Sequence, residues 1–265
     1  LAGNVKLMFQ PAEEGPGGAV PMLEEGLLDG PKVDAAFAIH LWNDLDVGQV
    51  GCRAGPVFAA QDEFQLKIIG KGGHGAAPHQ TVDPVVVAAH VVTAAQTIVS
   101  RKVDPTKTAV VTFGQVHGGT RHNIIPDVVT LSGTLRSLEA GVRKQLRREL
   151  QKIVETVARS FGATAELEIT AGYAPTVNDE KMTEVARQAA SEAVGAKKVV
   201  EQDITMGAED MSYVLEKVPG CYMVVGSRNA KKGLVYPHHS AKFDFDEAAL
   251  EVGVEVWLRL ARKIA

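Results

Sequence analysis

The hydrophobic and polar positions along this chain change their spacing twice. The first part alternates short apolar runs with helix-like segments, which is the rhythm of a mostly parallel α/β sheet. A second pattern, with clean alternation of apolar and polar residues, begins near residue 62 in "EFQLKIIG". After "GYAPTVND" the α/β pattern returns. The elements expected in the two α/β parts are strands at 5–9 and 35–41, helices at 18–28, 180–194, 209–217 and 247–264, and strands in "VGQVGCRAG" and "CYMVVG".

The middle of the chain predicts a domain of its own. Its elements follow the order strand, helix, strand, strand, helix, strand, which is the split order of a compact ferredoxin-like α+β domain. We therefore expect an α/β catalytic domain made of residues 1–58 and 174–265, interrupted by an inserted domain at 59–173. The default expectation for a site is the cleft between two such domains.

Composition narrows the classes of partner. The chain has 265 residues, 45% of them hydrophobic, and a formal net charge of −4. This mild charge argues against nucleic-acid and membrane partners, and no apolar run is expected to span a bilayer. Cys52 and Cys221 lie in strand-like contexts without a metal-type spacing partner, so we expect buried thiols and a reducing cytoplasm.

The start of the chain carries two further expectations. It opens on "LAGNVKLMF", with no initiator Met and no basic leader before an apolar region, so no signal peptide is expected. An α/β enzyme rarely begins on a catalytic strand. We therefore expect a segment upstream of Leu1 to be missing.

Glu13 and Glu14 stand where an apolar run gives way to glycines, in "FQPAEEGPGGA". This is expected to be the carboxyl end of a strand, where open α/β sheets bind ligands. Neighbouring side chains on an extended backbone point to opposite sides, so one carboxylate can hold a ligand while the other faces the reaction. The alternative is the acidic first turn of a helix, which suits the helix dipole.

Histidines occupy comparable positions elsewhere. His40 ends the apolar run "AAFAIH", and His238 and His239 lie in a loop before the last helix. Carboxylate and imidazole are the ligand types that zinc, manganese or cobalt takes, and a nearby free carboxylate can serve as general base for an activated water. The alternative is that His40 is a packed histidine and that the pair is a solvated loop.

Several longer motifs resemble one known family. They are "LMFQPAEEGPGGAVPMLEEG", "FAIHLW", "GKGGHGAAPHQTVDPV", "GGTRHNIIPD", "GTLRS", "MGAEDMSYVLEKVPG" and "YPHHSAKFDFDEAAL". In this order, and over nearly the whole chain, they resemble the M20 metallopeptidase family of the aminoacylases and zinc carboxypeptidases. The most similar branch is the amidohydrolase subfamily, with bacterial aminoacylases, hippurate hydrolases and indole-acetyl-amino-acid hydrolases.

The resemblance assigns roles to the residues of the α/β domain. It implies that Glu13 is the general base, Glu14 a metal ligand, and His40 a ligand of the other metal in a two-metal centre. His239 matches the last metal ligand of the family, whereas His238 fills a position at which the family pattern is less strict. The metals implied are Zn, Mn, Co or Ni, and no other cofactor is implied.

In the inserted domain the resemblance singles out three residues. His74 matches the histidine that holds the scissile carbonyl, often from a neighbouring subunit, so a homodimer through this lid and dimerisation domain is implied. Asn123 and Arg136 match residues that hold the substrate. An arginine fork suits a carboxylate, and a His or Asn donor suits a developing oxyanion. The alternatives are a turn residue for Asn123 and a solvated strand residue for Arg136. Glu209 is expected at most to support the metal ligands or to lie on the substrate side of the site.

The chain also departs from the family pattern. The subfamily carries an upstream Cys-x-His motif that supplies two metal ligands, and no such motif occurs here. The leading hypothesis is a metal-dependent amidohydrolase that cleaves N-acyl amino acids, or small peptide-like amides, with a metal-activated water. The alternative is an inactive fragment or pseudoenzyme that keeps dimerisation and ligand binding. For the chain as given we expect an empty site or a single ion on Glu14 and His239, and no measurable activity.

Overall fold

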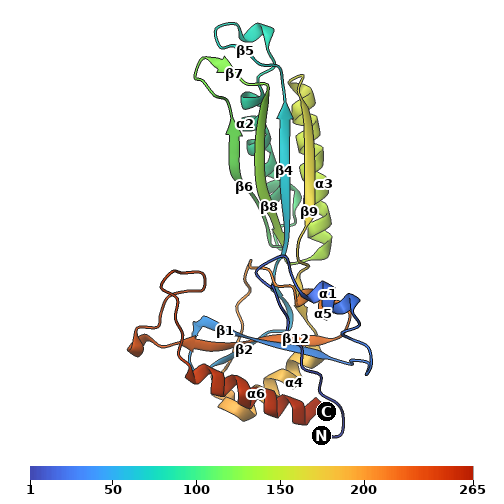
Figure 1. Cartoon of the computed structure of the whole chain (residues 1–265), viewed down its shortest axis with the longest axis vertical. Coiled ribbons are helices and arrows are strands. Elements are labelled where there is room, and N and C mark those ends of the chain that lie inside the picture. The colour runs from blue at the N-terminus through green and yellow to red at the C-terminus, as the bar shows by residue number, and fades with distance from the viewer. Residues whose placement is uncertain (265) are drawn as a thin grey trace. The chain divides into compact units, whose positions relative to one another are not determined.

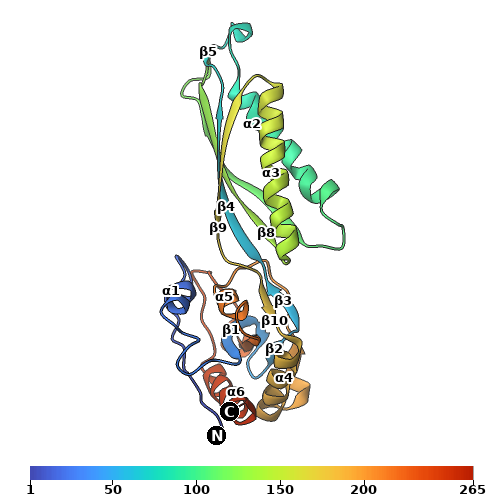
Figure 2. The same ribbon diagram turned by 90° about the vertical axis from the view of Figure 1, so that its right-hand side faces the viewer.

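A computed structural model describes residues 1–264, and the chain divides into two compact units. The first unit contains residues 1–58, 176–205 and 209 onward, and the second contains Ala59–Pro175 with Met206–Ala208 (Figures 1 and 2). Residues 206–208 join the second unit because Gly207 O accepts a hydrogen bond from Ala59 N at 2.8 Å. The sequence did not predict this return of the chain.

The first unit is built on a four-stranded sheet of order β1-β12-β2-β11. Strands β1 and β12 are parallel, as are β2 and β11, whereas β12 and β2 are antiparallel. The α/β class is confirmed, with a mixed sheet in which two of the three pairings are parallel. The strands are β1 (Ala36–Asp46), β2 (Val50–Cys52), β11 (Val199–Glu201) and β12 (Gly220–Arg228).

Successive residues of β12 pack into two different apolar clusters, because neighbouring side chains on a strand point to opposite faces of the sheet. Cys221, Met223 and Val225 pack with α4 (Glu180–Val194) and α6 (Ala248–Ile264). Tyr222 and Val224 pack in the other cluster, which includes residues of α1 (Ala19–Glu24) and α5 (Ser212–Leu215). Both cysteines are free and fully buried, as predicted. The remaining elements of this unit are β3 (Gly55–Phe58), β10 (Thr176–Asn178) and the 3-10 turns Ala196–Lys198 and Ala230–Lys232.

Two expectations about the first unit are wrong. Residues 5–9 form no strand: Leu7 is 73% exposed and Phe9 82%. A strand needs a partner for its backbone hydrogen bonds, and β1 pairs only with β12 within the described residues. The helix expected at 209–217 is shortened to Ser212–Leu215, because Ser212 N and Tyr213 N bond to Glu209 O and Asp210 O, three residues back rather than four, so residues 209–211 form turns.

The second unit is an antiparallel sheet of order β6-β8-β4-β9. Helices α2 (Pro84–Thr97) and α3 (Ala140–Ser160) cover one face (Figure 2). Inward-facing Phe64, Leu66 and Ile68 of β4 form the core with residues of both helices. The order β4-α2-β6-β8-α3-β9 is the one that the alternation predicts. The strands are β4 (Ala60–Ile69), β6 (Ala109–Gly118), β8 (Val128–Ser137) and β9 (Thr164–Ala171), with the small β5 (Gly73–His74) and β7 (Ile124–Ile125), the 3-10 turn Pro78–Gln80 and the π-turn Ile98–Lys102.

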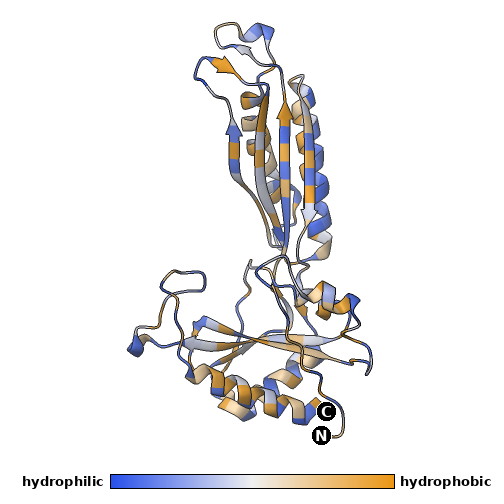
Figure 3. Cartoon of the chain, in the orientation of Figure 1, coloured by the Kyte–Doolittle hydropathy of each residue, from blue (hydrophilic) through white to orange (hydrophobic). Residues whose placement is uncertain are grey.

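The helix from Pro84 to Lys102 is more apolar than expected. An 18-residue stretch of this 19-residue helix has a mean hydropathy of 1.2, so by length and composition alone it could cross a membrane, contrary to the expectation from the sequence. Such a single helix is weak evidence of a membrane span, since core helices pass the same test. In the structure Val87, Val91 and Ile98 are buried in the core of the second unit. Figure 3 shows its apolar residues beside the amphipathic α3.

Candidate functional site

The Glu13–Glu14 turn is a tight loop between the unpaired N-terminal segment and α1. The carbonyl oxygen of Ala12 accepts hydrogen bonds from Gly15 N at 3.0 Å and Gly17 N at 2.9 Å. Ala12 adopts a left-handed φ of 54° to make this turn. Glu13 is half-buried, whereas the Glu14 side chain is 81% exposed. The two neighbouring carboxylates therefore lie in different surroundings.

The His238–His239 loop is held in place by Asn43 of β1. The Asn43 amide donates to Tyr236 O at 2.7 Å and Asp244 O at 3.1 Å, and the Asn43 backbone N–H donates to His238 Nε2 at 3.2 Å. His239 projects outward from this loop. Its Nε2 lies 3.9 Å from Glu14 Oε1, so the structure brings these two predicted ligands together. The sequence analysis missed Asn43, although an asparagine just after an apolar strand is a usable signal.

Backbone strain coincides with the two ligand-bearing loops. Among residues 1–264, Ala12 and His239 are the non-glycine residues with positive φ, at 54° and 62°. Such a conformation costs on the order of 1–3 kcal/mol and tends to cluster at functional sites. One of the two residues is a predicted metal ligand, and the other directly precedes the predicted base.

His40 lies exposed on β1, near the aromatic side chains of the first unit. Its ring centroid is 5.4 Å from that of His238 and 6.4 Å from that of Tyr222. The His40 Nδ1 atom is hydrogen-bonded to the carbonyl oxygen of Leu41. A backbone carbonyl on one ring nitrogen fixes the tautomer and leaves Nε2 as the free acceptor, as metal-binding histidines require. His238 Nε2, in contrast, already accepts the Asn43 N–H.

The acidic groups of this region affect one another. Partial burial raises the pKa of Glu13 to about 7, and the nearby carboxylates of Glu209, Glu14 and Asp210 add to this. Burial also raises the pKa of Glu209, although hydrogen bonds from Met211 N and the Tyr222 hydroxyl oppose the shift. A carboxyl group with a pKa near 7 is suited to take and return a proton at neutral pH.

Glu14 and His239 fit a divalent metal as a pair of donors. Zinc binds carboxylate oxygen and imidazole nitrogen at about 2.0–2.2 Å, so two donors at a tetrahedral angle lie roughly 3.4 Å apart. The 3.9 Å between His239 Nε2 and Glu14 Oε1 is close to this spacing and would shorten by about half an ångström around a bound ion. No group of three His, Cys, Asp or Glu side chains in residues 1–264 is arranged to hold a metal, so the third ligand of a catalytic site is not found there.

Of the three site residues expected in the inserted domain, His74 and Asn123 lie together in the second unit, and Arg136 lies apart from them. His74 of β5 pairs with Ile124, and Asn123 O accepts a hydrogen bond from Gly75 N at 2.9 Å, so His74 and Asn123 are neighbours. Arg136 is near the far end of β8, roughly 25 Å along the strand from its start at the usual rise per residue. The half-buried Arg136 donates through Nη1 to Met206 O at 2.7 Å, and burial lowers its pKa.

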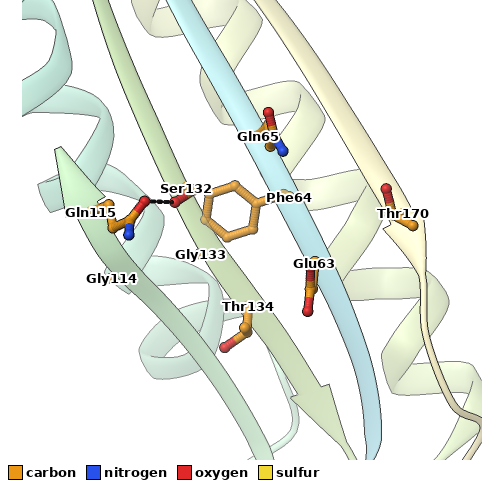
Figure 4. Close-up of a pocket in the computed structure, with 9 residues that line it drawn as sticks. All are labelled: Glu63, Phe64, Gln65, Gly114, Gln115, Ser132, Gly133, Thr134 and Thr170. Carbon is orange, nitrogen blue, oxygen red and sulfur yellow. Dashed lines mark hydrogen bonds between the residues drawn. The ribbon is translucent and has the colours of Figure 1, made fainter. Parts of the chain in front are cut away.

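A hollow of about 430 Å³ lies on the face of the second unit's sheet (Figure 4). At this hollow the Phe64 ring and Thr112 O pack directly against Gly133, because a Cβ there would lie 1.9 Å from Thr112 O and 2.5 Å from Phe64 Cζ. None of the predicted site residues lines it. The lining residues are Glu63, Phe64, Gln65, Gly114, Gln115, Ser132, Gly133, Thr134 and Thr170.

Known proteins resemble this chain over its whole length. Residues 1–263 match the family model described as peptidase family M20/M25/M40. Thermostable carboxypeptidase 2 of Saccharolobus solfataricus is 40% identical over 268 residues, which cover 100% of this chain and 67% of that protein. The N-acetyl-L-cysteine deacetylase of Bacillus subtilis is 38% identical over 250 residues, covering 94% of this chain and 58% of the deacetylase.

A solved structure agrees with these relatives. The crystal structure of the Bacillus subtilis YXEP protein, a dinuclear metal-binding peptidase of family M20, superposes with a TM-score of 0.79 at 31% identity. The match covers 97% of this chain but only 64% of that protein, so this chain spans less than two thirds of that protein's length. Because the family model matches residues 1–263, this chain belongs to peptidase family M20/M25/M40.

Proposed function

We propose that this chain carries the catalytic base and part of the metal site of a metal-dependent amidohydrolase that cleaves N-acyl amino acids. The observation that supports this most directly is the Glu14–His239 pair, 3.9 Å apart, with half-buried Glu13 next to Glu14 in the chain. Relatives of the chain include the N-acetyl-L-cysteine deacetylase and an N-acetyldiaminopimelate deacetylase, both named for removing an acyl group from an amino acid.

Different residues are proposed to bind the metal and to transfer the proton. Bound divalent metal would supply a Lewis acid that lowers the pKa of a water molecule and polarises the substrate carbonyl. Glu14 and His239 would hold one ion, and His40 would hold another through Nε2. Glu13 accepts the proton of the attacking water and returns it to the departing amine, for which a pKa near 7 is suitable.

The second unit supplies substrate contacts in this proposal. His74 and Asn123 are exposed neighbours, and an imidazole and an amide can both donate to the developing oxyanion. Arg136 is proposed to bind the substrate carboxylate through the part of its guanidinium that does not contact Met206 O. Since His74 lies in β5 and Arg136 lies near the end of β8 that is far from Val128, we propose that His74 contacts the substrate of a second copy of the chain in a homodimer.

We infer that the 265 residues alone do not complete the metal centre. A catalytic zinc site normally has three protein ligands, and no such group occurs within residues 1–264. The chain alone is therefore proposed to bind at most one ion and to hydrolyse no N-acyl amino acid at a measurable rate. The two buried free thiols agree with a reducing cytoplasm.

The experiment that tests the function uses a form of the chain extended to the length of its relatives. Glu13→Gln keeps the shape of the side chain but cannot take a proton, so it should retain metal and lose about 10²–10⁴-fold in kcat on N-acetyl amino acids. Glu14→Gln should instead reduce metal content. Near-normal turnover in both variants would show that the proposed site is wrong.

A further inference from the structure

The loop that carries Glu13 and Glu14 has a narrow neck. Its two sides meet at Pro11 and Gly18, where a Cβ added to Gly18 would lie 2.1 Å from Pro11 O and 2.6 Å from Pro11 Cδ. Between these residues the chain forms no helix or strand. The loop is therefore closed by contacts at its base, and Glu13 and Glu14 lie between them.

Asp210 bonds to both sides of this neck. Its Oδ2 atom accepts the backbone N–H groups of Gly18 at 2.7 Å and Ala19 at 2.8 Å. Its Oδ1 atom accepts a hydrogen bond from the side-chain amide of Gln10, which enters the loop from the other side. One carboxylate, from a residue about 190 positions away in sequence, thus joins the two ends of the loop.

This carboxylate is itself rigidly placed. Asp210 is fully buried, and a buried carboxylate is retained only where hydrogen bonds satisfy it. Its neighbour Glu209 accepts from Met211 N at 3.0 Å and from the hydroxyl of Tyr222 on β12 at 2.8 Å. The anchor of the loop is therefore connected to the central sheet of the first unit.

We propose that Asp210 is the positioning residue of the Glu13–Glu14 loop, acting through the backbone at Gly18 and Ala19 and through Gln10. It touches neither metal nor substrate. It sets the direction in which Glu14 meets His239 and Glu13 faces the reaction. Its functional meaning rests on the proposed function, but its effect on the loop can be measured without metal.

Hydrogen exchange of the metal-free 265-residue chain tests the first part. Asp210→Ala removes all three contacts, so exchange in residues 10–19 should accelerate by about ten- to a hundredfold, the range expected for losing charge-assisted hydrogen bonds. Asp210→Asn keeps an oxygen for Gly18 and Ala19 but loses the charge and the acceptor for Gln10, so exchange should accelerate by less than in Asp210→Ala. Asp179→Ala is the matched control, because Asp179 caps α4 by accepting from Met182 N at 2.9 Å and makes no contact with the loop.

Zinc titration of the same variants tests the second part. Asp210→Ala should weaken Zn²⁺ binding at least about tenfold, Asp210→Asn should weaken it by less, and Asp179→Ala should leave it unchanged. If Asp210→Ala does not fold, Gln10→Ala removes one donor to the same carboxylate without touching the core, and should show a smaller change in the same direction. Unchanged exchange in residues 10–19 would overturn the proposal, as would faster exchange with unchanged Zn²⁺ affinity. A wild-type chain that binds no Zn²⁺ would match the empty site that an incomplete set of ligands allows, and the exchange rates alone would then decide the role of Asp210 in the loop.

Discussion

Glu13 and Glu14 are adjacent in sequence, yet their surroundings suit them to different tasks. Glu14 is almost fully exposed and faces His239, so its carboxylate can bind an ion at little desolvation cost. Glu13 is half-buried near three other carboxylates, which raise its affinity for a proton. A ligand has to stay deprotonated and a general base has to exchange a proton near neutral pH. This difference in burial supports the proposed division of the two roles.

A kinetic measurement can decide whether Arg136 binds the substrate carboxylate or only contacts Met206 O. In the extended form, Arg136→Ala should raise KM for substrates with a free α-carboxylate by about ten- to a hundredfold, the equivalent of one charge-assisted hydrogen bond of about 1.5–3 kcal/mol. The matching esters should change far less. Arg136→Lys serves as control, because it keeps the charge but loses the planar fork. Equal losses on acids and esters would assign Arg136 to its contact with Met206 O alone.

At the scale of elements, ion pairs between Asp62 of β4 and two arginines of α3 connect this helix to the sheet of the second unit. The Asp62 side chain on β4 is 1% exposed and accepts from Arg143 Nη2 at 2.6 Å and Arg147 Nε at 2.6 Å. Burial alone would raise the pKa of Asp62, but the hydrogen bonds from Arg147 and Arg143 outweigh it and hold the pKa below its ordinary value of 3.8. These ion pairs therefore stabilise the fold only while Asp62 is ionised.

Asp62→Asn should lower the free energy of unfolding by about 3 kcal/mol at pH 7, because it leaves two partly buried guanidinium groups without a counter-charge. The folded pKa is lower than the unfolded one, so the folded state binds fewer protons. This contribution is complete well above pH 3.8 and is lost as the pH falls below that value. Urea unfolding at several pH values should therefore show the difference between variant and wild type shrinking in acid.

The control for this prediction is the exposed Lys67–Glu166 pair on the same sheet. Glu166→Gln should change the free energy of unfolding by less than about 1 kcal/mol. A difference between Asp62→Asn and wild type that stays constant from pH 7 to pH 2.5 would contradict the account of Asp62.

The elements differ in how far the sequence predicts them. The clean alternation in β4 and the capped helix α4 were predicted closely, because their period and ends are set by local residues. Residues 5–9 have the composition of a strand but no partner, and strand formation depends on a neighbour that composition does not show. Asn43 and Asp210 act through contacts with residues more than 190 positions away, which no local pattern reveals. Glu13, Glu14 and His239 were predicted as site residues because the motifs that contain them resemble those of a known family, and their roles stay predictions.

At the scale of the whole molecule, we expect two copies of the chain to associate through the second unit. Its helix α2 exposes Val85 and Val86, and the edge strand β6 exposes Val116, which suits an apolar contact between copies. Light scattering at micromolar concentration should give about twice the chain mass of 28.2 kDa.

Val86→Asp should shift this mass toward one chain. Val254→Asp is the matched control, since Val254 is a similarly exposed valine on α6 of the first unit. A wild-type chain that stays monomeric at these concentrations would contradict the proposed homodimer.

The central claim is that Glu14 and His239 together bind a divalent ion beside the base Glu13. Calorimetric titration of the purified 265-residue chain with Zn²⁺ tests it most directly. We expect no more than one weakly held ion per chain, because the described residues offer two close donors and no group of three. Glu14→Gln and His239→Ala should each abolish this binding, and Glu13→Gln should preserve it. Two tightly bound ions in the wild type, or Zn²⁺ binding that survives both Glu14→Gln and His239→Ala, would contradict the account.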